Sequence, residues 1–323
     1  MKFVDLPGGA GKMPIVGYGT WQAVDSELEA ALEEALTIGY RHIDTAYVYE
    51  NEHVVGKVLK KWLDAGKVKR DELFVVTKLP EVGNRPDGVE KYIKRSLEKL
   101  QLDYIDLYLV HVPFSYIERG DEIHPRKEDG SMLIDPTTDH VAVWKAMEAQ
   151  VAAGRTKAIG LSNFNERQIE RVVANATIKP VNLQVEVHAY FQQKELEKLC
   201  KKHGITMVAY SPLGSKSMQS ILAQIGIQKE LPDLFDNQVV LGIAEKLGKT
   251  PAQVLLRHTT QRGIAVIPKS VNPQRMKENF EILNFELTEE DVKALDGLDQ
   301  GPAARVLDFS FFKGITEHPE FPF

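Results

Sequence analysis

Short apolar runs alternate with longer amphipathic segments along the whole chain. Eight of the runs are rich in aliphatic and β-branched residues, which is typical of strands. They span residues 15–20, 40–46, 73–79, 105–112, 157–163, 181–187, 206–213 and 264–270. Because these runs are nearly continuously apolar rather than alternating, we expect a parallel sheet that is covered on both faces.

The segments between the runs have the 3.6-residue periodicity of amphipathic helices. They span residues 25–39, 51–66, 87–100, 139–154, 165–176, 192–204 and 250–263. In the first segment we predict that Asp25 or Ser26 caps the helix and that Gly39 ends it. The apolar stripe of this helix consists of Leu28, Ala31, Leu32 and Leu36.

The regular alternation of strand and helix predicts a (β/α)8 TIM barrel, an α/β fold of roughly 250 residues in its typical form. The chain has 323 residues, and the surplus can be placed outside the barrel. We predict an N-terminal β-hairpin over 2–17, a long loop over about 114–138, a second extended loop after 210–214 and a C-terminal tail at the active-site face. Because no linker-like segment interrupts the pattern, we expect one domain over residues 1–323.

A doubly wound open sheet is the competing architecture, and it would normally carry a glycine-rich dinucleotide fingerprint. Gly17 and Gly19 begin the pattern G-x-G-x-x-G, but Gln22 stands where the third glycine belongs. The segment around Gly11 imitates a phosphate-binding loop, yet Met13 follows Lys12 where Ser or Thr is required. Both glycine motifs are therefore incomplete, and the barrel is favoured.

Composition narrows the class of protein further. The formal net charge of −6 argues against a surface built for nucleic-acid phosphates or anionic lipid. Cys200 is the sole cysteine, so an intrachain disulfide and a cysteine-rich metal site are excluded. There is no signal-type apolar segment, and no apolar run reaches the roughly 20 residues that a membrane helix needs. We expect a cytoplasmic monomer that binds neither nucleic acid nor membrane.

Ionisable side chains stand at the ends of three consecutive predicted strands. Asp44 ends the second run and is followed by Tyr49, Lys78 lies at the end of the third run, and His111 at the end of the fourth. Each alone has an ordinary structural explanation, such as a helix cap, a core ring, a solvated strand end or a buried core histidine. In a barrel, however, the carboxyl ends of the strands meet at one face, so these four groups would converge.

Their chemistry suits proton transfer. An ammonium group beside a phenol lowers the phenol's pKa, so we predict that Lys78 lowers the pKa of Tyr49. A buried ammonium needs a carboxylate partner, which Asp44 can supply. His111 could then orient a carbonyl oxygen against the phenol for general acid catalysis.

Two other chemistries fit the sequence less well. The closest set of metal-ligand types is His42, Asp44 and Glu50, but His42 should face the opposite side of its strand from Ile43 and there is no second histidine cluster. We therefore expect no metal. A serine hydrolase would need G-x-S-x-G, and the segment around Ser162 lacks the second glycine.

Seven motifs, in order and at matching spacing, resemble those of the aldo-keto reductases, which are NADPH-dependent (β/α)8 oxidoreductases. They are GYRHIDTAYVYENE, VTKL, DYIDLYLVHVP, GLSNF, QVEVH, YSPLG and IPKSVNPQRMKEN. The resemblance covers nearly all of the chain. It implies reduction of aldehydes or ketones to alcohols by NADPH, with catalytic residues Asp44, Tyr49, Lys78 and His111 and with Tyr49 as the proton donor.

The resemblance also implies the residues around the cofactor and the substrate. The cofactor contacts implied are Thr20, Trp21, Ser162, Asn163, Gln184, Tyr210, Ser211, Leu213, Ser215, Lys269, Ser270, Val271, Arg275, Glu278 and Asn279. The substrate contacts implied are Trp21, Tyr47, Tyr49, His111, Val112 and Phe114, where some sugar-type reductases have Trp in place of Val112. Lys269 and Arg275 suit the adenosine 2′-phosphate, because Arg275 should lie in the first turns of a helix, where anions are favoured. A charged surface helix is the alternative explanation of that segment.

The substrate remains open at this level. The chain resembles insect members of the family, some of which reduce ketosteroids such as 3-dehydroecdysone, while sugar, lipid and aromatic aldehydes are alternatives. A non-catalytic NADPH-binding or structural relative of the family is the competing class of function. Such a relative would be free to lose the four catalytic residues, and their presence favours an enzyme.

Overall fold

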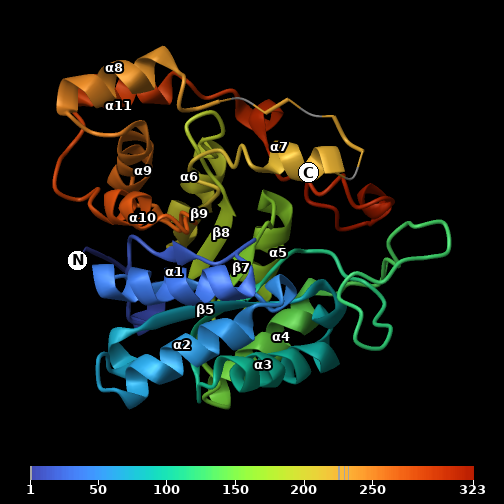
Figure 1. Ribbon diagram of the computed structural model, residues 1–323. Coiled ribbons are helices and arrows are strands. Elements are labelled where there is room, and N and C mark those ends of the chain that lie inside the picture. The colour runs from blue at the N-terminus through green and yellow to red at the C-terminus, as the bar shows by residue number, and fades with distance from the viewer. Residues whose placement is uncertain (1, 225, 229, 232) are drawn as a thin grey trace.

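The computed structural model describes residues 2–224, 226–228, 230–231 and 233–323. Eight strands form one sheet, and each neighbouring pair is parallel (Figure 1). They are β3 (Tyr18–Gly19), β4 (His42–Asp44), β5 (Phe74–Leu79), β6 (Ile105–Val110), β7 (Thr156–Ser162), β8 (Asn182–Glu186), β9 (Thr206–Tyr210) and β10 (Ala265–Val266). Seven of the strands lie within the predicted apolar runs, and β7 begins one residue before its run, so the periodicity located all eight strands.

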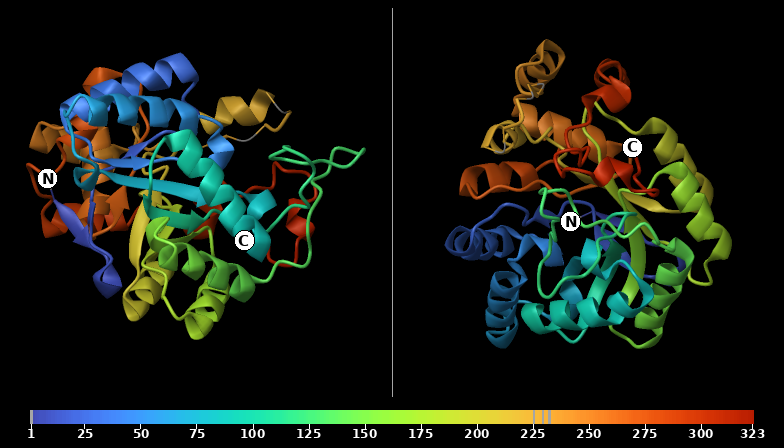
Figure 2. Two further views of the ribbon diagram at one scale, coloured as in Figure 1. Left: turned by 90° about the horizontal axis from the view of Figure 1, so that it is seen from below. Right: turned by 90° about the vertical axis from the view of Figure 1, so that its right-hand side faces the viewer.

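Backbone contacts between the first and last strands close the sheet into a barrel. Val16, directly before β3, forms a parallel bridge with Val266, and the Gly17 amide donates to the Val266 carbonyl at 2.8 Å. A Cβ atom at Gly19 would lie 2.7 Å from the carbonyl oxygen of Ile267, so only glycine allows this close approach. Gly17 and Gly19, which begin the incomplete dinucleotide motif, therefore lie where the first and last strands of the sheet meet and close the barrel. The (β/α)8 fold is confirmed, and helices ring the strands in the right view of Figure 2.

The helices that follow the strands cover the outside of the barrel. They are α1 (Asp25–Ile38), α2 (Glu52–Asp64), α3 (Pro86–Leu100), α4 (His140–Ala152), α5 (Glu166–Asn175), α6 (Lys194–His203) and α9 (Pro251–Gln261). All seven coincide with predicted segments. The predicted cap of α1 was wrong, because the N-cap is Val24, and Asp25 and Ser26 already lie inside the helix. Their carboxylate and hydroxyl therefore stand in the first turn rather than before it.

Four further helices lie in segments that the periodicity did not assign as barrel helices. They are α7 (Met218–Gln224), α8 (Gln238–Leu247), α10 (Pro273–Phe280) and α11 (Glu289–Asp296). Arg275 lies in the first turn of α10, as predicted, and Asn272 caps this helix by accepting from the Arg275 amide at 3.0 Å. The helix α8 packs against α9 and α11 at one side of the barrel (Figure 1).

Extra segments lie at both ends of the barrel. The predicted N-terminal hairpin is present as β1 (Phe3–Asp5) paired antiparallel with β2 (Lys12–Pro14). The 114–138 loop and the C-terminal tail lie together on the side opposite the N-terminus (Figure 1). They are joined by the Met132 amide, which donates to the Lys313 carbonyl at 2.8 Å, and by the Lys313 ammonium on the Asp129 carbonyl at 2.7 Å.

The hydrophobic core lies along the strands of the barrel. Every residue of β5 and β6 is buried, as expected for strands with side chains packed both inside the barrel and against the helices. Burial on this scale is the main stabilising contribution to the fold. Among the described residues, no helix is long and apolar enough to cross a membrane.

Candidate active site

Three of the predicted catalytic side chains meet at the carboxyl end of the barrel. The Lys78 ammonium, on β5, donates to Asp44 Oδ1 at 2.6 Å, to the Thr45 carbonyl at 2.8 Å and to the Tyr49 hydroxyl at 3.4 Å. Asp44 ends β4, which pairs with β5, and the short 3-10 helix η2 (Tyr47–Tyr49) turns Tyr49 back over the strand ends. Lys78 and Asp44 are 0% and 2% exposed, so this ion pair is almost fully desolvated.

His111 completes the group from the next strand. It directly follows β6, and its ring centroid lies 5.9 Å from that of Tyr49 in an edge-to-face arrangement. Its backbone carbonyl accepts from the Asn163 amide at 3.0 Å, which holds the turn after β6 in place. The ring borders the cavity described below, and its Nδ1 atom is buried without a hydrogen-bond partner among the described residues.

Two residues predicted to contact the cofactor form hydrogen bonds with Asp44. Gln184 Nε2 donates to Asp44 Oδ2 at 2.7 Å, and Thr20 Oγ1 donates to the Asp44 carbonyl at 3.0 Å. Both side chains are buried, and neither lines the cavity described below. Both oxygens of the Asp44 carboxylate are therefore paired, one with Lys78 and one with Gln184, which fixes the orientation of the carboxylate.

The predicted direction of the Tyr49 pKa is wrong. Burial raises the pKa of Tyr49 well above 10, and the negative charge of Asp44 adds to the increase. Lys78 does not reverse this, because Asp44 is closer to the ammonium than Tyr49 is and largely cancels its charge. Tyr49 is therefore protonated at neutral pH, which is the form that a proton donor requires.

Burial also decides the charge of the neighbouring bases. It lowers the pKa of Lys78, while the carboxylate of Asp44 opposes the decrease. It lowers the pKa of His111 well below 6.5, and the positive charge of Lys78 adds to that decrease. His111 is consequently neutral at physiological pH, with one ring nitrogen that can donate a hydrogen bond and one that can accept.

A cavity of about 470 Å³ opens above this group. Its wall includes Asp44, Tyr49 and His111 but not the side chain of Lys78, which lies beneath them. Of the predicted cofactor contacts, the wall includes Trp21, Asn163, Tyr210, Ser211, Leu213, Ser215, Lys269 and Arg275. Val112 also contributes to the wall, as predicted for a substrate contact.

Two predicted substrate residues lie behind the wall rather than on it. Tyr47 packs edge-to-face against Tyr92 with ring centroids 4.9 Å apart, and the Lys99 ammonium lies 3.9 Å from its ring centre. Phe114 is 1% exposed and packs against aromatic residues of the tail. Neither borders the cavity, because the turn after each strand directs its side chain into the surrounding core.

Several predicted cofactor contacts do not line the cavity either. They are Thr20, Ser162, Gln184, Ser270, Val271, Glu278 and Asn279. The Ser162 hydroxyl accepts from Asn163, the Ser270 carbonyl accepts from the Tyr18 hydroxyl, and Asn279 is buried within α10. Their contacts with the cofactor stay predictions.

The cavity also contains residues that the sequence did not single out. They include Val48, Glu81, His124, Phe235, Phe309, Phe311 and Phe312. For the phenylalanines of the C-terminal tail, the only hint in the sequence was that aromatic residues are frequent there. Glu81 and His124 carried no signal at all, because one lies in the short 3-10 helix η4 (Glu81–Gly83) and the other in the 114–138 loop.

Another part of the cavity wall carries hydroxyls and two cations. Ser211 and Ser215 both have left-handed backbone conformations, with φ of 48° and 43°, and their hydroxyls lie 2.7 Å apart. Lys269 and Arg275 are exposed, and neither forms an ion pair with any residue that the structure describes. Unpaired cations beside hydroxyl groups and the first turn of α10 form a surface suited to phosphate.

Tyr210 borders the cavity and belongs to a hydrogen-bond network. Its hydroxyl donates to Asn163 Oδ1 at 2.7 Å, while Asn163 Nδ2 donates to the His111 carbonyl and to Ser162 Oγ. Asn163 has φ of 61°, a conformation that Asn tolerates better than most residues. This network holds the Tyr210 side chain in place at the cavity wall.

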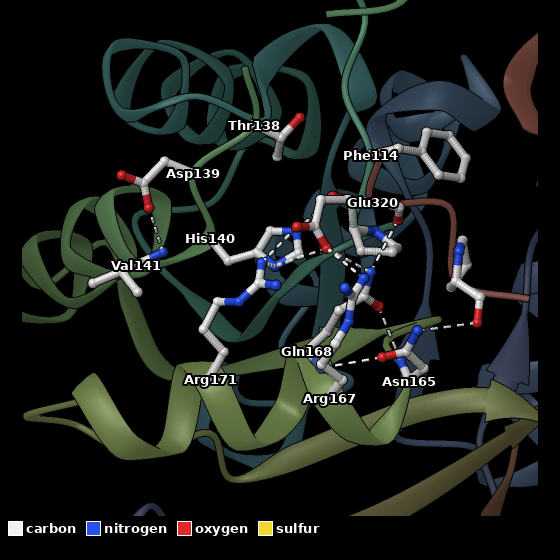
Figure 3. Close-up of polar contacts among 12 residues, drawn as sticks. Phe114, Thr138, Asp139, His140, Val141, Asn165, Arg167, Gln168, Arg171 and Glu320 are labelled. Atoms are coloured by element: carbon white, nitrogen blue, oxygen red, sulfur yellow. Dashed lines mark hydrogen bonds and ion pairs between the residues drawn. The ribbon is translucent and has the colours of Figure 1, made fainter. Parts of the chain in front are cut away.

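Two buried or half-buried carboxylates fasten the C-terminal tail over the cavity. At its start, Glu186 accepts from the Val306 and Leu307 amides at 2.7 and 2.8 Å. Near its end, Glu320 accepts from Arg171 at 2.7 Å and from Gln168 at 3.1 Å, both on α5 (Figure 3). The aromatic residues between these anchors form one wall of the cavity, so the anchors control its shape.

Replacing Glu320 by alanine should loosen the tail. Burial opposes ionisation of this carboxyl, but the hydrogen bonds from Arg171 and Gln168 lower its pKa, so it is charged at neutral pH. Losing charge-assisted hydrogen bonds worth about 1.5–3 kcal/mol should speed amide exchange over 305–323 by about tenfold or more. Hydrogen–deuterium exchange measures this.

The exposed carboxylate of Glu317, in the same tail, provides the control. Glu317→Ala should leave the exchange of 305–323 unchanged. Equal exchange in the Glu320 and Glu317 variants would show that the Glu320 contacts do not hold the tail.

Within the described part of the chain, no three or more His, Cys, Asp or Glu side chains are grouped so that they could hold a metal ion.

Comparison with known proteins identifies the class of this site and fold. Residues 15–300 match the profile of the Aldo/keto reductase family. Aldo-keto reductase family 1 member A1 of Rattus norvegicus is 44% identical over 290 residues, which cover 90% of this chain and 87% of that protein. The Homo sapiens protein of the same name is 43% identical over the same shares of each chain.

A solved structure gives the same result. The aldose reductase from Schistosoma japonicum matches the fold with a TM-score of 0.89 and 37% sequence identity, and the match covers 100% of this chain and 99% of that chain. The chain belongs to the aldo/keto reductase family, and it is an oxidoreductase.

Proposed function

We propose that this enzyme reduces aldehydes and ketones to alcohols with NADPH. The observation that carries the proposal is the Lys78 ammonium bonded to both Asp44 and the Tyr49 hydroxyl, at the base of a cavity whose far end carries Lys269 and Arg275. One end of this cavity offers a proton donor and the other offers cations. A carbonyl reductase with a phosphorylated cofactor requires both.

The proton moves from Tyr49 to the carbonyl oxygen. When bound, NADPH supplies the hydride that adds to the carbonyl carbon. Tyr49 is protonated because burial raises its pKa, and Lys78 stabilises the phenolate that forms when the proton leaves. Asp44 keeps Lys78 charged, and neutral His111 can donate a hydrogen bond to the same carbonyl oxygen.

The cofactor would lie along the cavity from Tyr210 to α10. The ring of Tyr210 offers a stacking surface for the nicotinamide, and Ser211 and Ser215 offer hydroxyls to the pyrophosphate. Lys269 and Arg275 would hold the adenosine 2′-phosphate, since both are cationic and free of carboxylate partners among the described residues.

Replacing Arg275 by methionine should weaken NADPH binding about tenfold or more while changing NADH binding little, because one charge-assisted contact to the 2′-phosphate is lost. Dissociation constants measured by fluorescence titration with each dinucleotide test this. Lys277→Met is the control, since Lys277 is an exposed cation of the same helix that does not border the cavity. If Arg275→Met weakened the binding of NADPH and NADH equally, the result would count against a contact with the 2′-phosphate.

Turnover tests the function directly. NADPH oxidation should be measured against a panel of sugar, lipid and aromatic aldehydes and a ketosteroid, with NADH in parallel. NADPH binding without oxidation by any carbonyl would favour the non-catalytic alternative. The ketosteroid prediction rests on resemblance alone, and a steroid ketone reduced no faster than a small control ketone would remove it.

The remaining expectations belong to the same proposal. We propose one domain over residues 1–323 that acts as a cytoplasmic monomer on a small-molecule substrate, without nucleic acid or membrane. The net charge of −6 supports this, since it does not favour binding to phosphate backbones or anionic lipid. Light scattering coupled to size exclusion would test the oligomeric state.

A further inference from the structure

The cavity wall contains a carboxyl group that the proposed chemistry does not use. Glu81 lies in η4, directly after β5, and borders the same cavity as Tyr49 and His111. It is 5% exposed, and it forms no ion pair with any residue that the structure describes. The carboxyl group accepts a hydrogen bond from its own backbone amide, but its Oε2 atom is buried and accepts no hydrogen bond from the described residues.

Burying a carboxyl oxygen without a hydrogen-bond partner is costly, and each such atom in a native structure calls for an explanation. Other polar atoms near Glu81 are also buried without a hydrogen-bond partner among the described residues. His111 Nδ1, His124 Nδ1 and the Tyr116 hydroxyl are also buried without a partner in the described part of the chain. His124 borders the cavity with Glu81, and its ring lies 6.2 Å from that of Tyr116. The unsatisfied polar atoms thus gather at the end of the cavity nearest the proposed proton donor.

We propose that Glu81 selects the substrate by charge, accepting a hydrogen bond from a hydroxyl or amide N–H near the carbonyl group and rejecting substrates that carry a carboxylate. This inference rests on the proposed function. A site with a buried acceptor discriminates strongly, because a ligand without the matching donor leaves the acceptor unpaired. A ligand carboxylate adds repulsion between like charges in a desolvated cavity.

Glu81 is close enough to Tyr49 for its charge to raise the pKa of the phenol, which places it beside the reacting group. The titratable and charged groups around it are those of Tyr49, His111, Tyr116, His124 and Arg126. Burial raises the pKa values of Tyr49 and Tyr116 and lowers those of His111 and His124, so all four are uncharged at neutral pH. Burial raises the pKa of Glu81 to about 7.

The direction of the pH effect follows from that value. Below about pH 7 the carboxyl of Glu81 is mostly protonated, and it repels a carboxylate ligand little. Above it Glu81 is mostly ionised, and the repulsion is present in full. Discrimination against carboxylates should therefore grow as the pH rises from 6 to 8.5.

The test compares benzyl alcohols that carry a carboxamide or a carboxylate at the ortho, meta or para position. Binding is measured by calorimetry in the presence of NADPH, with which an alcohol does not react. In the wild type at pH 8.5, at least one carboxamide should bind about tenfold or more tightly than its carboxylate partner. Glu81→Gln, which keeps the shape and removes the charge, should bring this ratio close to one.

Glu128→Gln is the matched control, because it removes one exposed negative charge in the 114–138 loop and should leave the ratio as in the wild type. The ratio in the wild type should also fall at pH 6, which tests the inference without any variant. A ratio that is the same in wild type and Glu81→Gln for all three positions would overturn the role of Glu81.

Rates with the corresponding aldehydes separate the two proposals. If the inference holds, the carboxylate should raise KM more than it lowers kcat, and Glu81→Gln should remove the difference in KM. Absence of turnover with every aldehyde would refute the proposed function, and the binding ratios would still decide the role of Glu81.

Discussion

Replacing Tyr49 by phenylalanine should lower kcat for a reactive aldehyde by about 10²–10⁴-fold, the usual contribution of a positioned general acid. The substitution removes the hydroxyl that Lys78 contacts at 3.4 Å and leaves the ring in place. NADPH affinity should remain close to that of the wild type, because the proposed phosphate contacts lie at the other end of the cavity. Stopped-flow or steady-state NADPH oxidation, combined with a fluorescence titration, measures both quantities.

Tyr104→Phe is the control for this loss. Tyr104 directly precedes β6, whereas His111 directly follows it, so the control removes a hydroxyl at the opposite end of the barrel. Its kcat should match that of the wild type. A Tyr49→Phe enzyme that keeps kcat within a factor of a few would require another proton donor. Because burial raises the pKa of Tyr49 well above 10, the wild-type rate should also show no loss from its ionisation between pH 6 and 9.

Replacing Asp44 by asparagine should lower the free energy of unfolding by about 3–5 kcal/mol, the typical cost of removing one partner of a buried ion pair. The ammonium of Lys78 is 0% exposed and would lose its only carboxylate contact among the described residues. The carbonyl of Thr45 and the hydroxyl of Tyr49 would remain, but neither carries a compensating charge. Urea unfolding followed by circular dichroism measures the difference.

The exposed pair of Lys60 and Asp64 on α2 provides the comparison. Asp64→Asn should cost less than about 1 kcal/mol, because solvent screens exposed pairs. Adding Lys78→Met to Asp44→Asn should recover much of the loss, since the uncompensated charge is then removed as well. Similar losses for Asp44→Asn and Asp64→Asn would show that desolvation of this pair is not a major stability factor.

The barrel itself was predictable because its signal is local and repeated. Each strand and each surrounding helix has its own periodicity, and eight parallel units of this length have few ways to bury their apolar faces. Three of the four proposed catalytic residues were found for the same reason: Asp44, Lys78 and His111 end strands that are neighbours in the sheet. The cap of α1 was misplaced because several polar residues near its start could serve, and the local backbone decided among them.

The lining of the cavity was predicted less completely. Tyr47 and Phe114 stand close in sequence to Tyr49 and His111, yet they pack into the core behind the cavity. The sequence also did not reveal that the Gln184 amide donates to Asp44, 140 residues earlier in the chain. These outcomes depend on which way a side chain leaves a turn, and on partners that are remote in sequence.

The sequence by itself determined the α/β architecture, the order of its strands and the ionisable groups at their carboxyl ends. It could do so because the periodicity that distinguishes strands from helices is a property of short segments. Only the tertiary structure decided that Tyr49 remains protonated and that Glu81 borders the cavity with one carboxyl oxygen unpaired among the described residues. The physical reason is that desolvation and charge pairing are set by the whole surroundings of a group. Segments such as β5, the 114–138 loop and the C-terminal tail supply those surroundings together, and no single stretch of sequence contains them.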